Sequence, residues 1–145
     1  MIKAVRHVGI VVHNMDKSVV FWRDIMGLSI VADFWEEGEF IDELENLKDV
    51  RLHMIKLSAP GGVLIELLKD DSHPNERNGE NNLCDIGIRH IAFTVENVDI
   101  SYNILNEYGC KMLSSPLISP DRKAKVFFAR DPEGNLLELV EIINN

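Results

Sequence analysis

The chain contains one sequence pattern twice, and this repeat constrains its fold more than any other feature. Arg6-His7-Val8-Gly9-Ile10 opens a segment that is similar to the segment opening on Arg89-His90-Ile91-Ala92-Phe93. Later in each half, residues 60–67 are similar to residues 132–139, and these segments contain Glu66 and Glu138. A repeat of this kind predicts two modules of the same fold that pack as one structure.

The two halves also share an order of predicted elements. The first half predicts a strand at 4–12, a helix capped by Asn14 or Asp16 that ends at Met26 before Gly27, and strands at 28–34, 50–58 and 63–69. The second half predicts a strand at 88–95, a helix from Asn97 or Asp99 to about Tyr108 before Gly109, and strands at 111–114, 124–129 and 135–142. Each half is therefore a βαβββ module, and the predicted fold class is α+β.

The first half is longer than the second, and the additional residues predict an insertion. His7 and Glu66 are 59 positions apart, whereas His90 and Glu138 are 48 positions apart. Apolar residues recur at helical spacing among the acidic residues over 35–48, which predicts a short amphipathic helix there. We expect a single domain over 1–145, with module 1 at about 1–70, a polar linker at 71–86 and module 2 at about 87–145.

Composition excludes some partners and indicates a compartment. The formal net charge is −9 over 145 residues, so neither nucleic acid nor an anionic membrane is expected as a partner. The two cysteines, Cys84 and Cys110, have no metal-site or secreted-scaffold spacing, and we interpret them as free thiols in a reducing cytoplasm. The apolar segment near the N-terminus is too short for a signal peptide or a membrane span.

The repeated His and Glu residues predict a metal site. Side chains alternate across a strand, so Glu66 shares a face with Leu64 and Leu68, and Glu138 shares one with Leu136 and Val140. A carboxylate among aliphatic side chains is costly to bury unless a metal or a counter-charge satisfies it. The neighbours of His7 and His90 on their faces include the small residues Gly9 and Ala92, which leave room for an ion and a bound molecule.

Two imidazoles and two carboxylates are suitable ligands for one divalent cation. We therefore predict a site formed by His7, Glu66, His90 and Glu138, with two positions left for the adjacent oxygens of a small substrate. The alternative is that each His is a hydrogen-bonded residue at a sheet edge and each Glu faces solvent, as a register error of one residue would produce.

These residues resemble the vicinal oxygen chelate superfamily, also called the glyoxalase, bleomycin resistance and dioxygenase superfamily. The similarity extends over the whole chain and includes Phe21-Trp22-Arg23-Asp24, Arg89-His90-Ile91-Ala92-Phe93 and Asp131-Pro132-Glu133-Gly134-Asn135 before Leu137-Glu138-Leu139. The resemblance implies two tandem βαβββ modules that form a curved mixed sheet cup around one divalent metal ion (Zn, Ni, Co, Mn or Fe). It also implies a homodimer, with the site within one chain or across the dimer.

Within this superfamily, the ligand types favour the glyoxalase I pattern. Glyoxalase I uses His or Gln, Glu, His and Glu, whereas extradiol dioxygenases and fosfomycin-resistance enzymes use three ligands and lack a carboxylate at the position of Glu66. Methylmalonyl-CoA epimerases share the two His and the final Glu. Val11 and Asp70 stand where bacterial glyoxalases hold Arg and Asn for glutathione, so the resemblance does not extend to glutathione recognition.

The resemblance implies an isomerase or lyase that removes the proton next to a metal-chelated carbonyl, which is enediolate chemistry. Glu138 is the preferred base and Glu66 the second choice. The alternatives are an Fe(II)-dependent ring-cleaving dioxygenase and a drug-sequestering resistance or binding protein. Of the other candidates, His13 is expected in a turn, His53 in ordinary packing rather than at a substrate, and Trp22 in the core.

Overall fold

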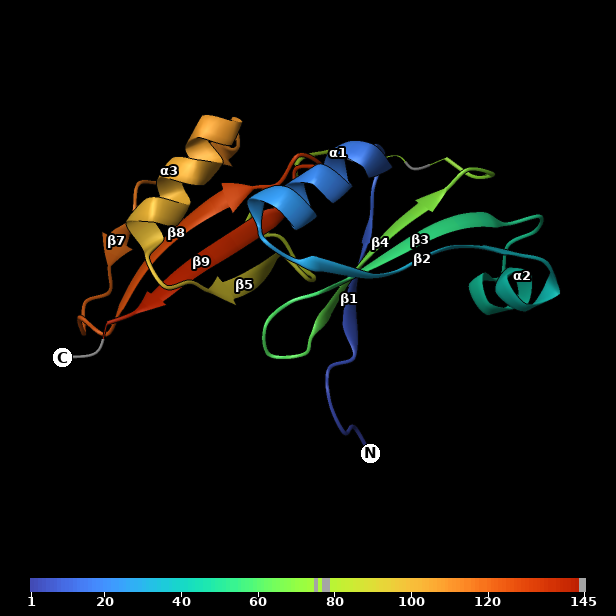
Figure 1. The fold of residues 1–145 in the computed structure, drawn as a ribbon, viewed down its shortest axis with the longest axis horizontal. Helices are drawn as coiled ribbons and strands as arrows, with labels where there is room; N and C mark the ends of the chain where they lie inside the picture. Colours follow the sequence, from blue (N-terminus) through green and yellow to red (C-terminus); the bar gives the residue numbers. More distant parts are fainter. Residues whose placement is uncertain (75, 77–78, 144–145) are drawn as a thin grey trace. The chain divides into compact units, whose positions relative to one another are not determined.

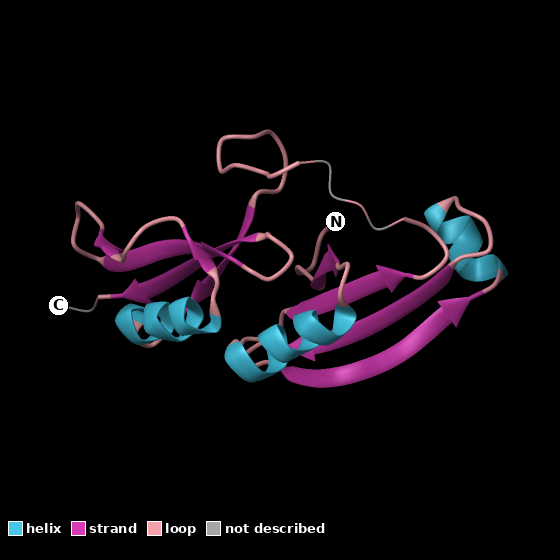
Figure 2. Cartoon of the chain, turned by 90° about the horizontal axis from the view of Figure 1, so that it is seen from above, coloured by secondary structure: helices cyan, strands magenta, loops and turns pink. Residues whose placement is uncertain are grey.

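The computed structural model describes residues 1–74, 76 and 79–143. The chain divides into two compact units, Met1–Arg77 and Asn78–Asn145. Each unit has its own mixed β-sheet with helices packed against it (Figures 1 and 2). Within the described residues, no helix has both the length and the apolar character that a membrane span requires.

The first unit contains a four-stranded sheet in the order β1-β4-β3-β2. Strands β1 and β4 are parallel, and the other neighbouring strands are antiparallel. Its elements in chain order are β1 (His7–Val11), α1 (Met15–Val19), the π-helix η1 (Val20–Ile25), β2 (Ser29–Glu37), α2 (Glu39–Glu45), β3 (Arg51–Ser58) and β4 (Leu64–Asp70).

The second unit repeats this arrangement. Its sheet has the order β5-β9-β8-β6, with β7 also paired to β8, and β5 and β9 are parallel. Its elements are β5 (His90–Thr94), α3 (Val98–Tyr108), β6 (Lys111–Met112), β7 (Leu117–Ile118), β8 (Ala124–Arg130) and β9 (Leu136–Ile142). Helix α3 runs along β8 and β9 (Figure 1), and Tyr102 contacts Phe127 edge to face. The predicted α+β class and the two related modules are confirmed.

Both predicted long helices begin at an asparagine. The side chain of Asn14 accepts a hydrogen bond from the backbone of Lys17, and Asn97 does the same for Ile100. These bonds satisfy amide groups that have no partner within the helix. Helix α3 ends at Gly109, whose φ of 93° lies in the left-handed region that glycine adopts without steric cost.

The first strand and the inserted helix are shorter than predicted. β1 begins at His7 because its parallel partner β4 begins at Leu64, directly opposite, so residues 4–6 have no strand beside them. The predicted helix at 35–48 is wrong at its start, because β2 continues to Glu37 through pairing with β3. The helix itself, α2, occupies only Glu39–Glu45.

A further strand, β7, was not predicted. Only Leu117 and Ile118 form it, and they pair with Val126 and Lys125 of β8. A strand of two residues is too short to show the alternation from which longer strands are predicted. The second unit therefore has one strand more than the predicted module.

The core of each unit lies between its sheet and its helices. Fully buried side chains in the first unit include Phe21, Trp22, Leu57 and Leu67, which confirms the predicted core position of Trp22. In the second unit the corresponding side chains include Val98, Phe127, Leu137 and Leu139. Burial of these apolar groups is the main source of stability.

Candidate metal centre

In the first unit, His7 and Glu66 lie on neighbouring parallel strands and contact each other. His7 Nε2 is 3.2 Å from Glu66 Oε2. Gly9 stands opposite Glu66 in the β1–β4 register, and a Cβ atom at Gly9 would lie 3.4 Å from Leu68 Cδ1. Glu66 is buried, with 5% of its surface exposed.

The second unit contains an equivalent pair. His90 Nε2 is 3.1 Å from Glu138 Oε2. The strands β5 and β9 have the same parallel register as β1 and β4, and Ala92 stands opposite Glu138. Gly9 and Ala92, the small residues predicted on the same face as each His, therefore stand opposite the Glu of the same unit.

Each unit thus brings together one nitrogen donor and one oxygen donor. Such donors are suitable for zinc and for first-row divalent ions. Among the residues that the structure describes, no group of three or more His, Cys, Asp or Glu side chains is arranged to hold a metal ion. The structure therefore places the four predicted residues in two pairs, one in each unit.

Lys56 is a residue of this site that the sequence analysis missed. It stands opposite Glu66 in the β3–β4 register, and its Nζ is 3.0 Å from Glu66 Oε1. The two carboxylate oxygens of Glu66 thus have different partners, His7 and Lys56. The buried carboxylate has a counter-charge, which is one of the two conditions under which burial of a carboxylate is tolerated.

The sequence did contain a signal for Lys56. Pro60-Gly61-Gly62 between two predicted strands indicates a tight connection, and antiparallel strands pair symmetrically about such a connection. Counting outward from Gly61 places Lys56 opposite Glu66, as the register shows.

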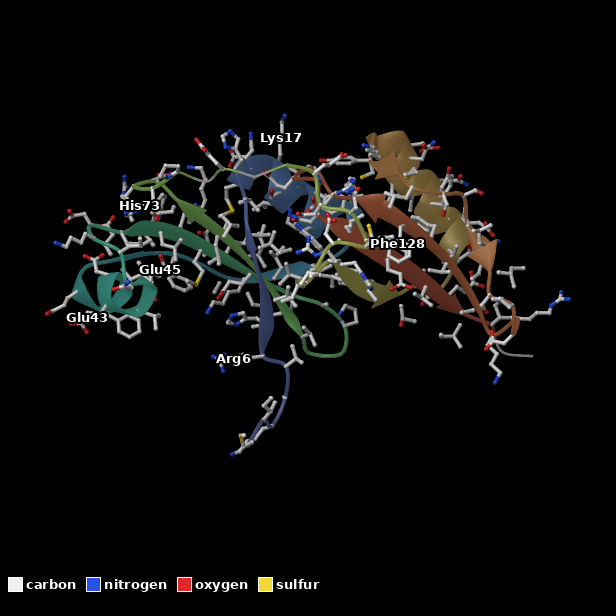
Figure 3. All side chains as sticks on the ribbon, turned by 180° about the vertical axis from the view of Figure 1, so that it is seen from behind. Arg6, Lys17, Glu43, Glu45, His73 and Phe128 are labelled. Carbon is white, nitrogen blue, oxygen red and sulfur yellow. The ribbon has the colours of Figure 1, made fainter. Side chains whose placement is uncertain are left out.

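Phe128 occupies the position in the second unit that Lys56 occupies in the first. It stands opposite Glu138 in the β8–β9 register, and its side chain is labelled in Figure 3. Its ring contacts the imidazole of His90 edge to face, with 5.4 Å between the ring centroids. The two His-Glu pairs are therefore equivalent in their donors and different in their neighbours.

The inserted helix α2 packs on the face of the first sheet that carries Glu66. Its buried residue Ile41 clusters with Leu52 and Met54, and Phe34 and Leu68 pack against this cluster. By strand alternation, Leu52, Met54 and Lys56 share one face of β3, and Leu68 and Glu66 share the same face of β4. Glu43 and Glu45 also lie on α2 (Figure 3), as the predicted amphipathic pattern requires.

The remaining histidines of the first unit do not join the His7–Glu66 pair. His53 lies on the opposite face of β3, stacks on Trp35 and contacts Asp33 at 2.7 Å. With His13 it lines a cavity of about 330 Å³.

His73 is half-buried and forms a hydrogen bond with Asp70. Burial alone would raise the pKa of Asp70, but hydrogen bonds from Ser72 and His73 lower it below its usual value. His73 and Ser72 therefore stabilise the charged form of the Asp70 carboxylate.

Comparison with known proteins identifies the family. Residues 4–139 match the Glyoxalase/Bleomycin resistance protein/Dioxygenase superfamily, and the chain belongs to that superfamily. The match includes both His-Glu pairs and confirms the resemblance seen in the sequence.

Several individual proteins are similar over nearly the whole chain. A glyoxalase family protein from Bacillus cereus has a TM-score of 0.88 at 23% identity, covering 98% of this chain and 97% of that one. The trypanothione-dependent glyoxalase I of Leishmania major has a TM-score of 0.69 at 18% identity, covering 96% of this chain and 86% of that one. At these identities the likeness shows a shared fold.

A relative with a named activity is similar in sequence. The metallothiol transferase FosB of Staphylococcus haemolyticus is 28% identical over 141 residues, covering 96% of this chain and 84% of that protein. Members of the superfamily therefore include metal-dependent enzymes of more than one reaction type.

Proposed function

We propose that this chain is a divalent-metal-dependent enzyme in which His7, Glu66, His90 and Glu138 bind one cation (Zn, Ni, Co, Mn or Fe). The observation that carries the proposal is the pair of equivalent contacts, 3.2 Å in the first unit and 3.1 Å in the second. Two nitrogen and two oxygen donors leave open positions on a six-coordinate ion. The four ligands come from one chain or from two chains of a homodimer.

The proposed reaction is proton abstraction next to a carbonyl group, as in an isomerase or a lyase. When bound, the cation would polarise the carbonyl and lower the barrier to loss of the neighbouring proton. The chain supplies the base, which must lie within hydrogen-bond reach of the carbon acid. The substrate is a small molecule with adjacent oxygens that can chelate the ion.

Glu138 is the preferred base for a reason that comes from its surroundings. The Glu66 side chain is 7% exposed and pairs with the Lys56 ammonium, whereas the Glu138 side chain is 24% exposed and faces Phe128 across the strands. A carboxylate held by an ammonium is less able to move toward a substrate proton. Glu66 therefore serves mainly as a ligand in this proposal.

Thiol transfer is a second candidate reaction, and the observation that favours it is the similarity to the metallothiol transferase FosB. The same cation would then hold the electrophilic substrate, and a thiol would form a C–S bond to it as the bond from that carbon to an oxygen leaving group breaks and the leaving oxygen takes up the thiol proton. The two candidates differ in whether a low-molecular-weight thiol is consumed.

The proposed location for either reaction is the cytoplasm, which the two free thiols Cys84 and Cys110 support.

The experiment that tests the proposed reaction measures exchange of carbon-bound protons with solvent deuterium. Metal-loaded protein is incubated with hydroxycarbonyl, thiol-adduct and acyl-CoA substrates in D₂O, and exchange is followed by NMR. We expect exchange in one class, with a loss of about a hundredfold or more in Glu138→Gln. Glu107→Gln, an exposed position on α3, is the control and retains activity.

Other outcomes of the same screen identify the alternatives. Consumption of a thiol without exchange indicates a transferase, and oxygen uptake with catechols after loading with Fe(II) indicates a dioxygenase. Tight binding of a drug-like molecule by protein that takes up no metal indicates a sequestering protein. Any of these results contradicts proton abstraction as the main activity.

A further inference from the structure

The ion pair of Lys56 and Glu66 provides a second cation next to the proposed metal site. Lys56 Nζ is 3.0 Å from Glu66 Oε1, and its side chain is 24% exposed. The ammonium also lies 5.4 Å from the centroid of the Phe34 ring. A metal ion bound by Glu66 would therefore share that carboxylate with the Lys56 ammonium.

Two positive charges that share a carboxylate repel each other. The repulsion is stronger in a partly buried place than in water, because the effective dielectric constant is lower. An additional anion beside the pair of cations would offset this cost. The second unit has no such requirement, because Phe128 replaces the ammonium.

We propose that Lys56 is a specificity-determining residue, which selects substrates with a carboxylate or similar anionic group beside the oxygens that chelate the metal. The inference rests on the proposed metal site and names the substrate class of that site. Lys56 pairs with Glu66 when the site holds no ligand, and it contacts the anionic group of the substrate when a metal ion draws on Glu66. A neutral substrate of the same shape leaves the ammonium without an anion.

The test measures binding of Co²⁺ alone and then of two probes to cobalt-loaded protein by calorimetry. The probes are oxalate, which is anionic, and acetoin, which is a neutral chelator. Lys56→Met removes the charge and keeps an unbranched side chain. Lys69→Met is the matched control, because Lys69 lies on β4 on the face opposite Glu66 and pairs with Asp71.

In Lys56→Met we expect Co²⁺ to bind about tenfold more tightly and oxalate about tenfold more weakly, since a charge-assisted hydrogen bond is lost. The acetoin affinity of Lys56→Met stays close to wild type. The affinities of Lys69→Met for Co²⁺ and for the two probes also stay close to wild type. Lys56→Arg keeps the charge and retains the preference for oxalate. It also keeps the proposal testable if Lys56→Met does not fold.

Two failures can be told apart. If the wild type binds Co²⁺ and Lys56→Met changes neither affinity, Lys56 is only a structural counter-ion and this inference is overturned while the metal site stands. If the wild type binds no Co²⁺, nor Zn²⁺, Ni²⁺, Mn²⁺ or Fe²⁺, the proposed function itself fails, and with it the role given to Lys56.

Discussion

Phe128 in the second unit occupies the register position that Lys56 occupies in the first. Each stands directly opposite the glutamate of its own His-Glu pair. A duplicated backbone thus presents two identical donor pairs, one beside an ammonium and one beside an aromatic ring. This difference supports the division of roles proposed above, with Glu66 held as a ligand and Glu138 available as a base.

Introducing a charge at Phe128 should weaken metal binding. Phe128→Lys places an ammonium opposite Glu138, so we expect Co²⁺ affinity to fall by about tenfold through competition for the carboxylate. Phe128→Met removes the ring without adding charge and serves as the control. Equal affinities for the two variants, measured by calorimetry, would show that the neighbour's charge does not influence the site.

Loss of the buried contact of α2 should destabilise the first unit. Ile41 is 3% exposed and packs with Leu52 and Met54, so Ile41→Ala is expected to lower the free energy of unfolding by about 2–5 kcal/mol. Phe40 on the same helix is 69% exposed, and Phe40→Ala should change the free energy of unfolding by less than about 0.5 kcal/mol. Urea denaturation measures both. Similar small effects would mean that α2 is not packed on this face.

Asp131 should make stability fall as pH rises. Burial raises its pKa above the usual 3.8, although the backbone amides of Glu133 and Asn135 donate hydrogen bonds to it. The folded chain therefore binds this proton more tightly than the unfolded chain. Its contribution is fully present below pH 3.8 and is lost as pH rises through the folded-state pKa.

Asp131→Asn removes this titration, so the variant should gain stability relative to wild type over that pH range in urea denaturation. Asp121 is the contrasting control, because a hydrogen bond from Ser119 lowers its pKa. Asp121→Asn should lose stability relative to wild type as pH rises. The same trend in both variants would contradict the assignment for Asp131.

The two cysteines should differ in reactivity. Burial raises the pKa of Cys110 to about 11, whereas Cys84 is exposed. At pH 8 only about one Cys110 thiol in a thousand is ionised, so alkylation there should be slow. Mass spectrometry after brief iodoacetamide treatment should find Cys84 modified first, and both cysteines modified in urea. Equal rates in the native protein would show that Cys110 is accessible and ionised.

The fold could be predicted from sequence because the repeat and the helix caps are local signals. Asn14 and Asn97 begin the helices where predicted, and Gly109 ends α3. The end of β2 could not be predicted, because the continuation to Glu37 depends on pairing with Arg51 of β3. Trp35, Glu36 and Glu37 were assigned to a helix on spacing alone.

The site could be predicted only in part. His7, Glu66, His90 and Glu138 were found because the repeat preserves their residue types, and the structure brings them together in pairs. Lys56 has no repeated counterpart, since the second half has Phe128 at that position. A search for preserved residue types cannot detect a position at which the two halves differ.

In the proposed site, both His-Glu pairs serve one metal ion. Elemental analysis after equilibrium dialysis against Co²⁺ gives the number of ions per chain for the wild type, His7→Ala and His90→Ala, with folding checked by circular dichroism. A shared ion predicts one per chain in the wild type and almost none in either variant. Two ions per chain, or a variant that keeps its full metal content, would show that the two pairs do not share one ion.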